Sequence, residues 1–146
     1  MNTITDFVAV SCYPLNSDFT MKSSSEAVGE LNQFVSLYPN RNIVMEETGY
    51  ASSSVCNSSE KQQADYITAL FSWWDKNSSQ VPFIGLLWLH DLSQQQTDAF
   101  AKDYGITNVP DFKEYLRTLG LRTYSGTGVD KTAITTLKSE LQKRGW

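Results

Sequence analysis

The chain has 146 residues, 40% hydrophobic and 12% aromatic, which is enough for one packed domain and excludes disorder as a description of the whole. Sixteen acidic against twelve basic residues give a net charge of -4, which argues against a nucleic-acid partner because phosphate binding needs a concentrated basic patch. No apolar run approaches the roughly 18 residues that span a bilayer, and the first residues lack the pattern of a signal peptide. We therefore expect no nucleic-acid or membrane partner, and the compartment stays unknown.

The first third of the chain predicts a strand followed by a helix. Residues 6–13 are rich in β-forming side chains, and Pro14 ends this run. Ser23 and Glu26 form a capping box, after which apolar residues recur at helical spacing until Pro39. The pattern therefore indicates a strand, a polar loop and an amphipathic helix.

The middle of the chain repeats this order. Residues 42–46 are apolar on both faces, which is typical of a buried strand. A second amphipathic helix ends near Asn77, and residues 81–89 form the third and most apolar strand. The order β-α-β-α-β predicts right-handed crossovers and a parallel sheet with helices packed on it.

Additional helices follow the third strand. A short helix begins after Ser93, and another begins near Pro110 with Gly120 as its C-terminal cap. A glycine-rich turn at residues 125–128 precedes a last helix, for which Asp130 is the expected N-cap. We therefore expect one α/β domain, residues 1–146, with three βα units and extra C-terminal helices.

Cysteine and histidine usage limits the chemistry. Cys12 and Cys56 are too few for a disulfide scaffold and too far apart for a CxxC motif, so we expect two free thiols, with one disulfide as the alternative. His90 is the only histidine, so a His-rich metal site is excluded and no metal or cofactor is expected.

Chemistry-bearing side chains cluster where the three strands end, which is where parallel α/β folds bind ligands. These ends carry Tyr13, the pair Glu46-Glu47, and Trp88 with His90 and Asp91. Regular alternation places Ile43, Met45 and Glu47 on one face of the second strand, with Val44 and Glu46 on the other. We expect Glu47 to be the functional carboxylate, since the chain turns immediately afterwards, and Glu46 to be an outward group paired with a base.

Three motifs carry a resemblance to a known family. In order they are Val10-Ser11-Cys12-Tyr13-Pro14, Glu46-Glu47-Thr48-Gly49-Tyr50 and Ile84-Gly85-Leu86-Leu87-Trp88. Together they resemble strands six, seven and eight of the (β/α)8 glycoside hydrolases of clan A. The Glu-Thr-Gly-Tyr segment is similar to that of the endo-β-1,4-galactanases, and cellulase-like families have a comparable signature. The resemblance implies the C-terminal part of a TIM barrel.

The resemblance also implies roles for individual residues. Glu47 matches the nucleophile of a retaining glycoside hydrolase, Tyr13 matches a tyrosine that orients this carboxylate, and Trp88 matches the aromatic floor beneath the sugar. Tyr50, together with His90 and Asp91 named above, is expected to contact the substrate, a β-linked polysaccharide or oligosaccharide.

One part of the family pattern is missing. The general acid/base follows an asparagine at the end of the fourth strand, and this sequence contains no Asn-Glu pair. Eight βα units need about 250 residues, so the chain has room for three strands only. We expect a fragment that carries the nucleophile half of the site and is inactive alone. The alternatives are a non-catalytic carbohydrate-binding or interaction module and an unrelated flavodoxin-like domain.

The exposed edges of such a short sheet predict that the chain associates with other copies of itself. Strands that are paired on both sides in a closed barrel would here have an unpaired edge, which favours homo-oligomers.

Overall fold

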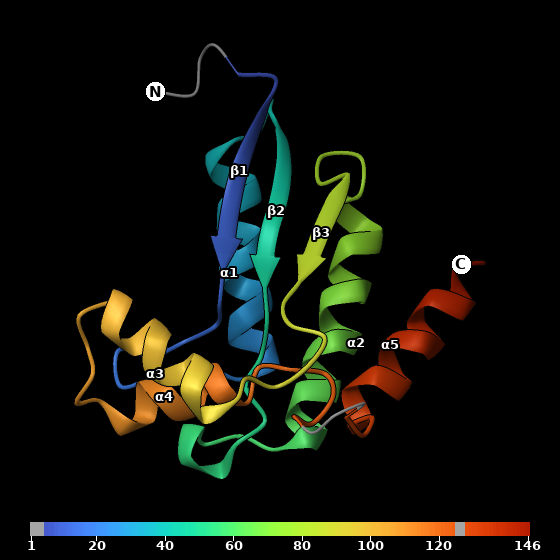
Figure 1. Ribbon diagram of the computed structural model, residues 1–146. Helices are drawn as coiled ribbons and strands as arrows, with labels where there is room; N and C mark the ends of the chain where they lie inside the picture. Colours follow the sequence, from blue (N-terminus) through green and yellow to red (C-terminus); the bar gives the residue numbers. More distant parts are fainter. Residues whose placement is uncertain (1–4, 125–127) are drawn as a thin grey trace.

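The computed structural model describes residues 5–124 and 128–146 and confirms the predicted α/β fold. Its sheet has the order β1 (Phe7–Cys12), β2 (Asn42–Thr48) and β3 (Phe83–Leu86), and both neighbouring pairs are parallel. All three carboxyl ends therefore lie at the same end of the sheet (Figure 1).

A layer of helices covers one face of the sheet (Figure 1). α1 (Ser24–Leu37) connects β1 to β2, and α2 (Glu60–Asn77) connects β2 to β3. α5 (Thr132–Lys143) packs against α2, and Arg144 just beyond it donates to both carboxylate oxygens of Asp75, at 2.7 and 2.5 Å. None of the helices in the described parts of the chain combines the length and apolarity needed to cross a bilayer.

A helical hairpin lies beyond the carboxyl end of the sheet (Figure 1). It consists of α3 (Gln94–Asp103) and α4 (Pro110–Arg117), which an ion pair between Lys113 and Asp98 joins at 2.6 Å. The short 3-10 helix η1 (Ser54–Cys56) packs against α4. The hairpin is thus placed to form a wall above the strand ends.

Local sequence explains where α1 begins. The Ser23 hydroxyl accepts a hydrogen bond from the backbone N–H of Glu26, and the Glu26 carboxylate accepts one from the backbone N–H of Ser23 at 2.9 Å. The predicted capping box is therefore present. Ser93 and Gln96 form the same motif at the start of α3.

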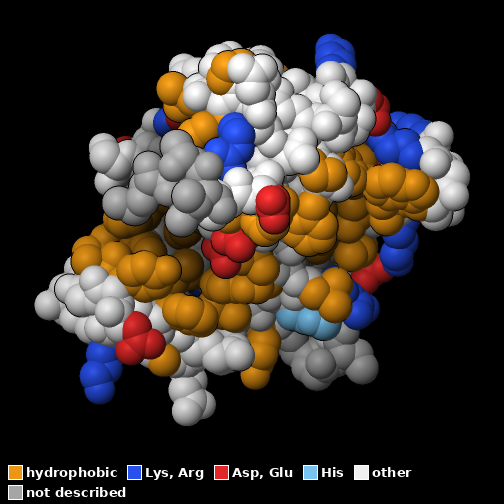
Figure 2. All heavy atoms as spheres, turned by 90° about the horizontal axis from the view of Figure 1, so that it is seen from above, with side chains coloured by type: hydrophobic (Ala, Val, Ile, Leu, Met, Phe, Trp, Pro, Cys, Tyr) orange, Lys and Arg blue, Asp and Glu red, His pale blue; other side chains and the backbone are white. Residues whose placement is uncertain are grey.

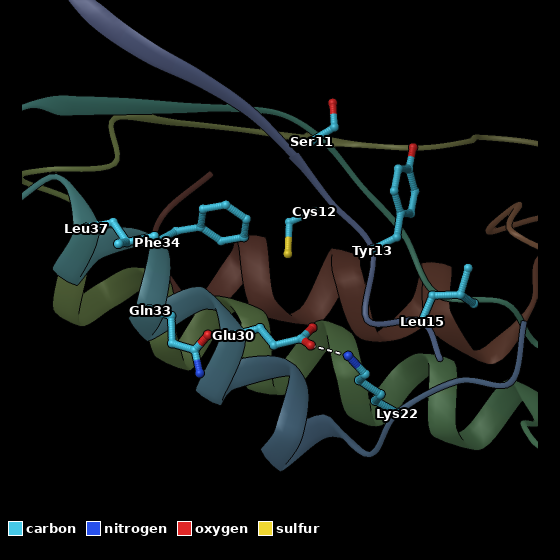
Figure 3. A pocket seen from close by; sticks show the side chains of 9 residues that line it. All are labelled: Ser11, Cys12, Tyr13, Leu15, Lys22, Glu30, Gln33, Phe34 and Leu37. Atoms are coloured by element: carbon cyan, nitrogen blue, oxygen red, sulfur yellow. Dashed lines mark hydrogen bonds and ion pairs between the residues drawn. The ribbon is translucent and has the colours of Figure 1, made fainter. Parts of the chain in front are cut away.

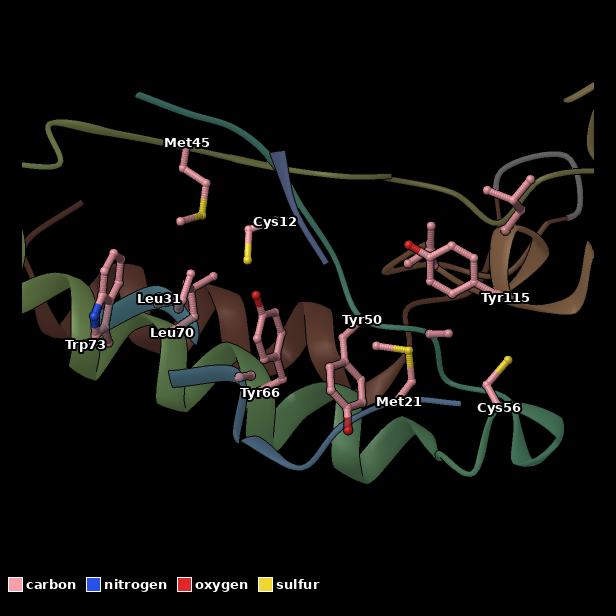
Figure 4. Close-up of a cluster of buried hydrophobic side chains, with 14 of the residues drawn as sticks. Cys12, Met21, Leu31, Met45, Tyr50, Cys56, Tyr66, Leu70, Trp73 and Tyr115 are labelled. Carbon is pink, nitrogen blue, oxygen red and sulfur yellow. The ribbon is translucent and has the colours of Figure 1, made fainter. Parts of the chain in front are cut away.

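The main core lies between the sheet and the helix layer (Figure 4). Met45 of β2 packs with Leu70 and Trp73 of α2 in this cluster, and each is at most 4% exposed. Thr48 also faces the helices, because its hydroxyl lies 2.5 Å from that of Tyr66. Met45 and Thr48 therefore share a face although three positions separate them.

A β-bulge in β2 explains this spacing and corrects the predicted alternation. Val10 of β1 pairs with Met45, but the next residue, Ser11, pairs with Glu47. Glu46 is thus an extra residue, and the side chains that follow it change faces. Glu47 lies on the open face of the sheet, opposite Met45, whereas regular alternation predicted one face for both.

Three other details differ from the sequence prediction. β3 is shorter than the expected strand at 81–89, because after Leu87 the backbone bonds switch from β2 to the segment around Leu121. Gly120 does not cap α4, which ends at Arg117 with Thr118 as its C-cap. Asp130 does not cap α5; it pairs with basic side chains. Of the predicted glycine-rich turn, residues 125–127 lie outside the described residues.

The second face of the sheet has no helix layer in the described structure. Phe83 pairs with Val44 across this face and is 52% exposed, and Phe7 at the start of β1 is 49% exposed. Figure 2, which views the molecule from above, shows broad hydrophobic areas interrupted by acidic side chains. The sheet is therefore packed on one side and open on the other.

Gly85 is required beside the bulge, and this can be tested. A Cβ atom at Gly85 would lie 2.2 Å from the backbone oxygen of Glu46, so alanine forces β2 and β3 apart. We expect Gly85→Ala to lower the free energy of unfolding by about 1–3 kcal/mol. Gly29→Ala is the matched control, since a Cβ atom added there would meet no atom outside its own stretch of α1 within 4 Å, and it should stabilise the helix by about 0.5–1 kcal/mol. Urea unfolding measures both, and equal effects would contradict the role of Gly85.

Candidate functional site

A cavity of about 370 Å³ lies at the carboxyl ends of the strands. The strand ends contribute a tyrosine, a glutamate and a tryptophan, and the α3–α4 hairpin contributes aromatic and aliphatic side chains. The lining residues are Tyr13, Glu47, Leu87, Trp88, Phe100, Tyr104, Phe112, Tyr115, Leu116 and Leu119. Glu47 is the only carboxylate among these described lining residues.

Tyr13 and Glu47 are hydrogen-bonded in this cavity. The Tyr13 hydroxyl donates to Oε2 of Glu47 at 3.2 Å. Burial, followed by the Glu47 charge and this hydrogen bond, raises the pKa of Tyr13 well above its ordinary value. Tyr13 therefore stays protonated and remains a donor to the carboxylate.

Side chains on the two sides of β1 have different surroundings. Ser11 and Tyr13 point away from the helices, whereas Cys12 points toward them (Figure 3). The bulge in β2 brings Glu47 to the same open side as Tyr13. Glu46 is exposed and does not line the cavity. Geometry thus brings Glu47 to the tyrosine, and its chemical role stays a prediction.

An aromatic wall surrounds the carboxylate. The ring of Trp88 lies 5.6 Å from that of Phe100, and the rings of Tyr104 and Phe112 lie 5.5 Å apart. Tyr115 approaches Tyr13 edge-on at 6.2 Å. Such faces can pack on the apolar faces of sugar rings. The peptide bond between Leu87 and Trp88 is cis.

Part of this wall escapes sequence reasoning. The apolar stripe of α4 predicts core residues, and Phe112 and Tyr115 are indeed buried, but they also line the cavity. Phe100 and Tyr104 are not among the predicted site residues. Their spacing of four residues, which places two aromatic rings on one helical face, is the signal that could have found them.

The structure places Asp91 outside this cavity, in a buried ion pair. Nζ of Lys131 donates to Oδ1 of Asp91 at 2.5 Å, to Oγ of Ser52 at 3.0 Å and to the backbone oxygen of Gly120 at 2.9 Å. Burial raises the pKa of Asp91, although the hydrogen bond and charge of Lys131 oppose this effect. Lys131 therefore joins the segments that carry Asp91, Ser52 and Gly120, and Asp91 presents no free carboxylate to the Glu47 cavity.

His90 and Tyr50 also lie away from the cavity lining. The backbone of His90 pairs with Arg122, and its ring lies beside Gly128. Tyr50 is 2% exposed; its hydroxyl donates to the backbone oxygen of Lys22 at 2.7 Å and its ring stacks on Tyr66. A side chain this buried has no face to offer a sugar. Of the predicted site residues, the structure brings Tyr13, Glu47 and Trp88 together.

A second cavity of about 330 Å³ lies on the helix side of β1 (Figure 3). An ion pair between Lys22 and Glu30 crosses it. Burial and the nearby Glu30 raise the pKa of Cys12 to about 11, and burial raises that of Cys56 to about 12. Both cysteines are free, as predicted, and both are protonated thiols rather than nucleophilic thiolates.

Metal-ligating side chains do not gather in the described part of the chain. Within it, no group of three or more His, Cys, Asp or Glu side chains is arranged to hold a metal ion.

Comparisons with known proteins support the fold. No protein-family model matches the chain, and no curated protein does. Among solved structures, a β-glucuronidase of Faecalibacterium prausnitzii superposes with a TM-score of 0.70 at 16% identity, over 96% of this chain and 23% of that one. A β-glucuronidase of Ruminococcus gnavus gives 0.55 at 17% identity, over 94% and 22%.

The chain therefore spans less than a quarter of the length of these enzymes. At such identities the likeness shows the fold alone, which is that of three βα units of a TIM barrel. The comparisons support this barrel resemblance but not the finer resemblance to galactanases.

The Lys131–Asp91 pair provides a stability test. Lys131→Met leaves the Asp91 carboxylate buried without its partner, so we expect unfolding to become easier by about 3–5 kcal/mol. Lys61→Met is the matched control, because Lys61 pairs with Asp65 on the surface, where such pairs contribute about 0–1 kcal/mol. Denaturant unfolding compares the two variants. If Lys131→Met lowers the free energy of unfolding no more than the control does, the Lys131–Asp91 pair does not stabilise the connection between the segments that Lys131 joins.

Proposed function

We propose that the chain supplies the nucleophile half of a retaining glycosidase site that acts on β-linked polysaccharide. The observation that carries the proposal is the hydrogen bond between Tyr13 and Glu47, inside an aromatic-lined cavity at the carboxyl ends of parallel strands. A carboxylate oxygen of Glu47 attacks the anomeric carbon, and the bond from that carbon to the leaving oxygen breaks with its electron pair on the oxygen.

Tyr13 and Trp88 have separate roles in this proposal. The Tyr13 hydroxyl holds Oε2 of Glu47, which leaves Oε1 available for attack. A protonated Tyr13 also keeps the carboxylate oriented without neutralising it. Trp88 and Phe100 offer apolar ring faces on which a sugar can pack.

A complete retaining site needs a second carboxyl group, about 5 Å from the first, to protonate the leaving oxygen. The described residues that line the cavity include Glu47 alone. On this proposal the acid is contributed by further βα units, either elsewhere in a longer protein or on another chain.

The alternative is a non-catalytic carbohydrate-binding module. Nine of the ten lining residues are uncharged, and such a surface binds sugars without performing chemistry. The two functions differ in whether Glu47 forms a bond to the sugar, and this is what the experiment must detect.

An activated substrate tests the nucleophile without the missing acid. A 2,4-dinitrophenyl 2-deoxy-2-fluoro-β-glycoside carries a leaving group that departs unprotonated, and the fluorine slows breakdown of the covalent product. We expect intact-mass spectrometry to show one glycosyl adduct, with peptide mapping to Glu47. Natural β-galactan and β-glucan should show no appreciable turnover, because general acid catalysis contributes about 100-fold to 10,000-fold.

Two variants control this experiment. Glu47→Gln should form no adduct, whereas Glu46→Gln, one residue away on the exposed bulge, should react like the unchanged chain. Sugar binding without an adduct would favour the binding module. Turnover of the natural polysaccharides at ordinary enzyme rates would contradict the half-site.

We also propose that the chain associates through its sheet. β1 and β3 are the two edges of the described sheet, and their outer backbone groups can pair with other strands. Phe7 and Phe83 add exposed apolar surface on the open face. We expect the partner in a purified sample to be a second copy of the chain, because no other protein is present there.

Sedimentation at micromolar concentration tests this association. We expect dimers or larger species, and we expect the double variant Phe7→Lys with Phe83→Lys to shift them toward monomer by placing charges on the open face. Leu37→Lys is the control, since Leu37 is 69% exposed at the end of α1, away from that face. A monomeric unchanged chain would refute the proposal.

A further inference from the structure

The charge of the Glu47 cavity is one-sided. Of the ten lining residues only Glu47 carries a charge, and that charge is negative. The sequence has twelve Lys and Arg residues, and none of them lies in the undescribed stretches 1–4 and 125–127. The cavity lining therefore receives no basic side chain from this chain.

Three basic residues near this end of the molecule have other partners, and a fourth, Lys102 of α3, is exposed and does not line the cavity. Lys113 of α4 pairs with Asp98 at 2.6 Å, and Arg117 pairs with Glu114 at 2.7 Å. Lys131 is held by Asp91 at 2.5 Å. Turning any of these three side chains toward the cavity would leave a carboxylate without its partner. They are therefore not available to bind an anion there.

We propose that this half-site selects neutral glycosyl groups and excludes uronic acids, with the α3–α4 hairpin as the selecting element. The inference rests on the proposed function, in which Glu47 contacts the anomeric carbon. A uronate carboxylate is attached to C5 of the same sugar ring, three bonds from that carbon, so two like charges would meet beside an aromatic wall. The aromatic wall would remove water from the uronate carboxylate without providing a cation to pair with it, which is unfavourable for a charged group.

The hairpin residues define the selecting surface. The ring of Phe100 is tilted against that of Trp88, and Tyr104 packs against Phe112 while 67% of it remains exposed at the rim of the cavity. These rings fit the apolar faces of a neutral pyranose, and the Tyr104 hydroxyl suits an uncharged hydroxyl partner. The fold resembles that of β-glucuronidases, but the charge of this cavity does not suit a glucuronide.

A matched pair of labels tests the selection. The 2,4-dinitrophenyl 2-deoxy-2-fluoro derivatives of β-glucose and β-glucuronic acid differ only at C6. We expect the glucoside to label Glu47 at least about tenfold faster than the glucuronide. The repulsion between two negative charges this close together, in partly buried surroundings, is large enough to slow a reaction by more than about tenfold. Intact-mass spectrometry over time gives both rates.

A lysine placed at the rim of the cavity should weaken the preference for the glucoside. Tyr104→Lys places a positive charge at the exposed rim, and we expect it to raise the glucuronide-to-glucoside rate ratio by about tenfold. Tyr124→Lys is the matched control, because Tyr124 is 58% exposed and does not line the cavity, and it should leave the ratio unchanged. Both substitutions are at exposed positions, so the fold is retained.

The outcomes separate the two proposals. If the unchanged chain reacts with the glucuronide as fast as with the glucoside, or faster, the selection is refuted while the role of Glu47 stands. If neither sugar labels Glu47, the proposed function fails and the inference fails with it. An equal rise in the ratio for both tyrosine variants would show a general charge effect and refute the role of the hairpin.

Discussion

One extra residue in β2 determines where the candidate site lies. Because Val10 pairs with Met45 and Ser11 with Glu47, Glu46 falls outside the ladder and the strand continues with its faces exchanged. A regular strand would direct Glu47 into the helix layer, where Met45 packs. The bulge directs it to the open face beside Tyr13 instead, and Gly85 provides the space that the displaced backbone needs.

The position of this carboxylate is stabilised by polar contacts on the opposite, buried side. Directly after Glu47, the Thr48 hydroxyl donates to the backbone oxygen of Cys12 at 2.8 Å and meets the hydroxyl of Tyr66. Farther along, Lys131 joins the loop after β2, the segment after β3 and the end of the α4 region. Buried polar groups are costly to leave unpaired, so these contacts resist any slip of β2 that would return Glu47 to the helix side.

The parts of this arrangement that depend on neighbouring residues could be predicted from the sequence. The capping box of Ser23 and Glu26 is local, and so is the alternation of apolar runs that indicates a parallel sheet. The bulge could not be predicted, because it depends on which residue of β1 faces which residue of β2. Asp91 was misplaced for a similar reason, since its partner Lys131 lies 40 positions away. The aromatic residues Phe100 and Tyr104 of the hairpin could not be assigned to the site from the sequence, because only the fold brings them to the strand ends.

The open face links stability to chemistry. By register, Phe83 shares this face with Val44, and Glu47 lies on the same face farther along β2. Covering the face would remove the exposed phenylalanines from water, a favourable change of about 25 cal/mol for each Å² of apolar surface. The same covering would take water away from Glu47 and strengthen its hydrogen bond to Tyr13. On the proposed function, further βα units that cover the open face and bury the phenylalanines also bring the second carboxyl group, so covering the face and completing the site are one event. A ligand that contacts both Glu47 and the second carboxyl group must then stabilise the covered form of the sheet. The free energy of this stabilisation equals the free energy by which covering the sheet improves binding of the ligand.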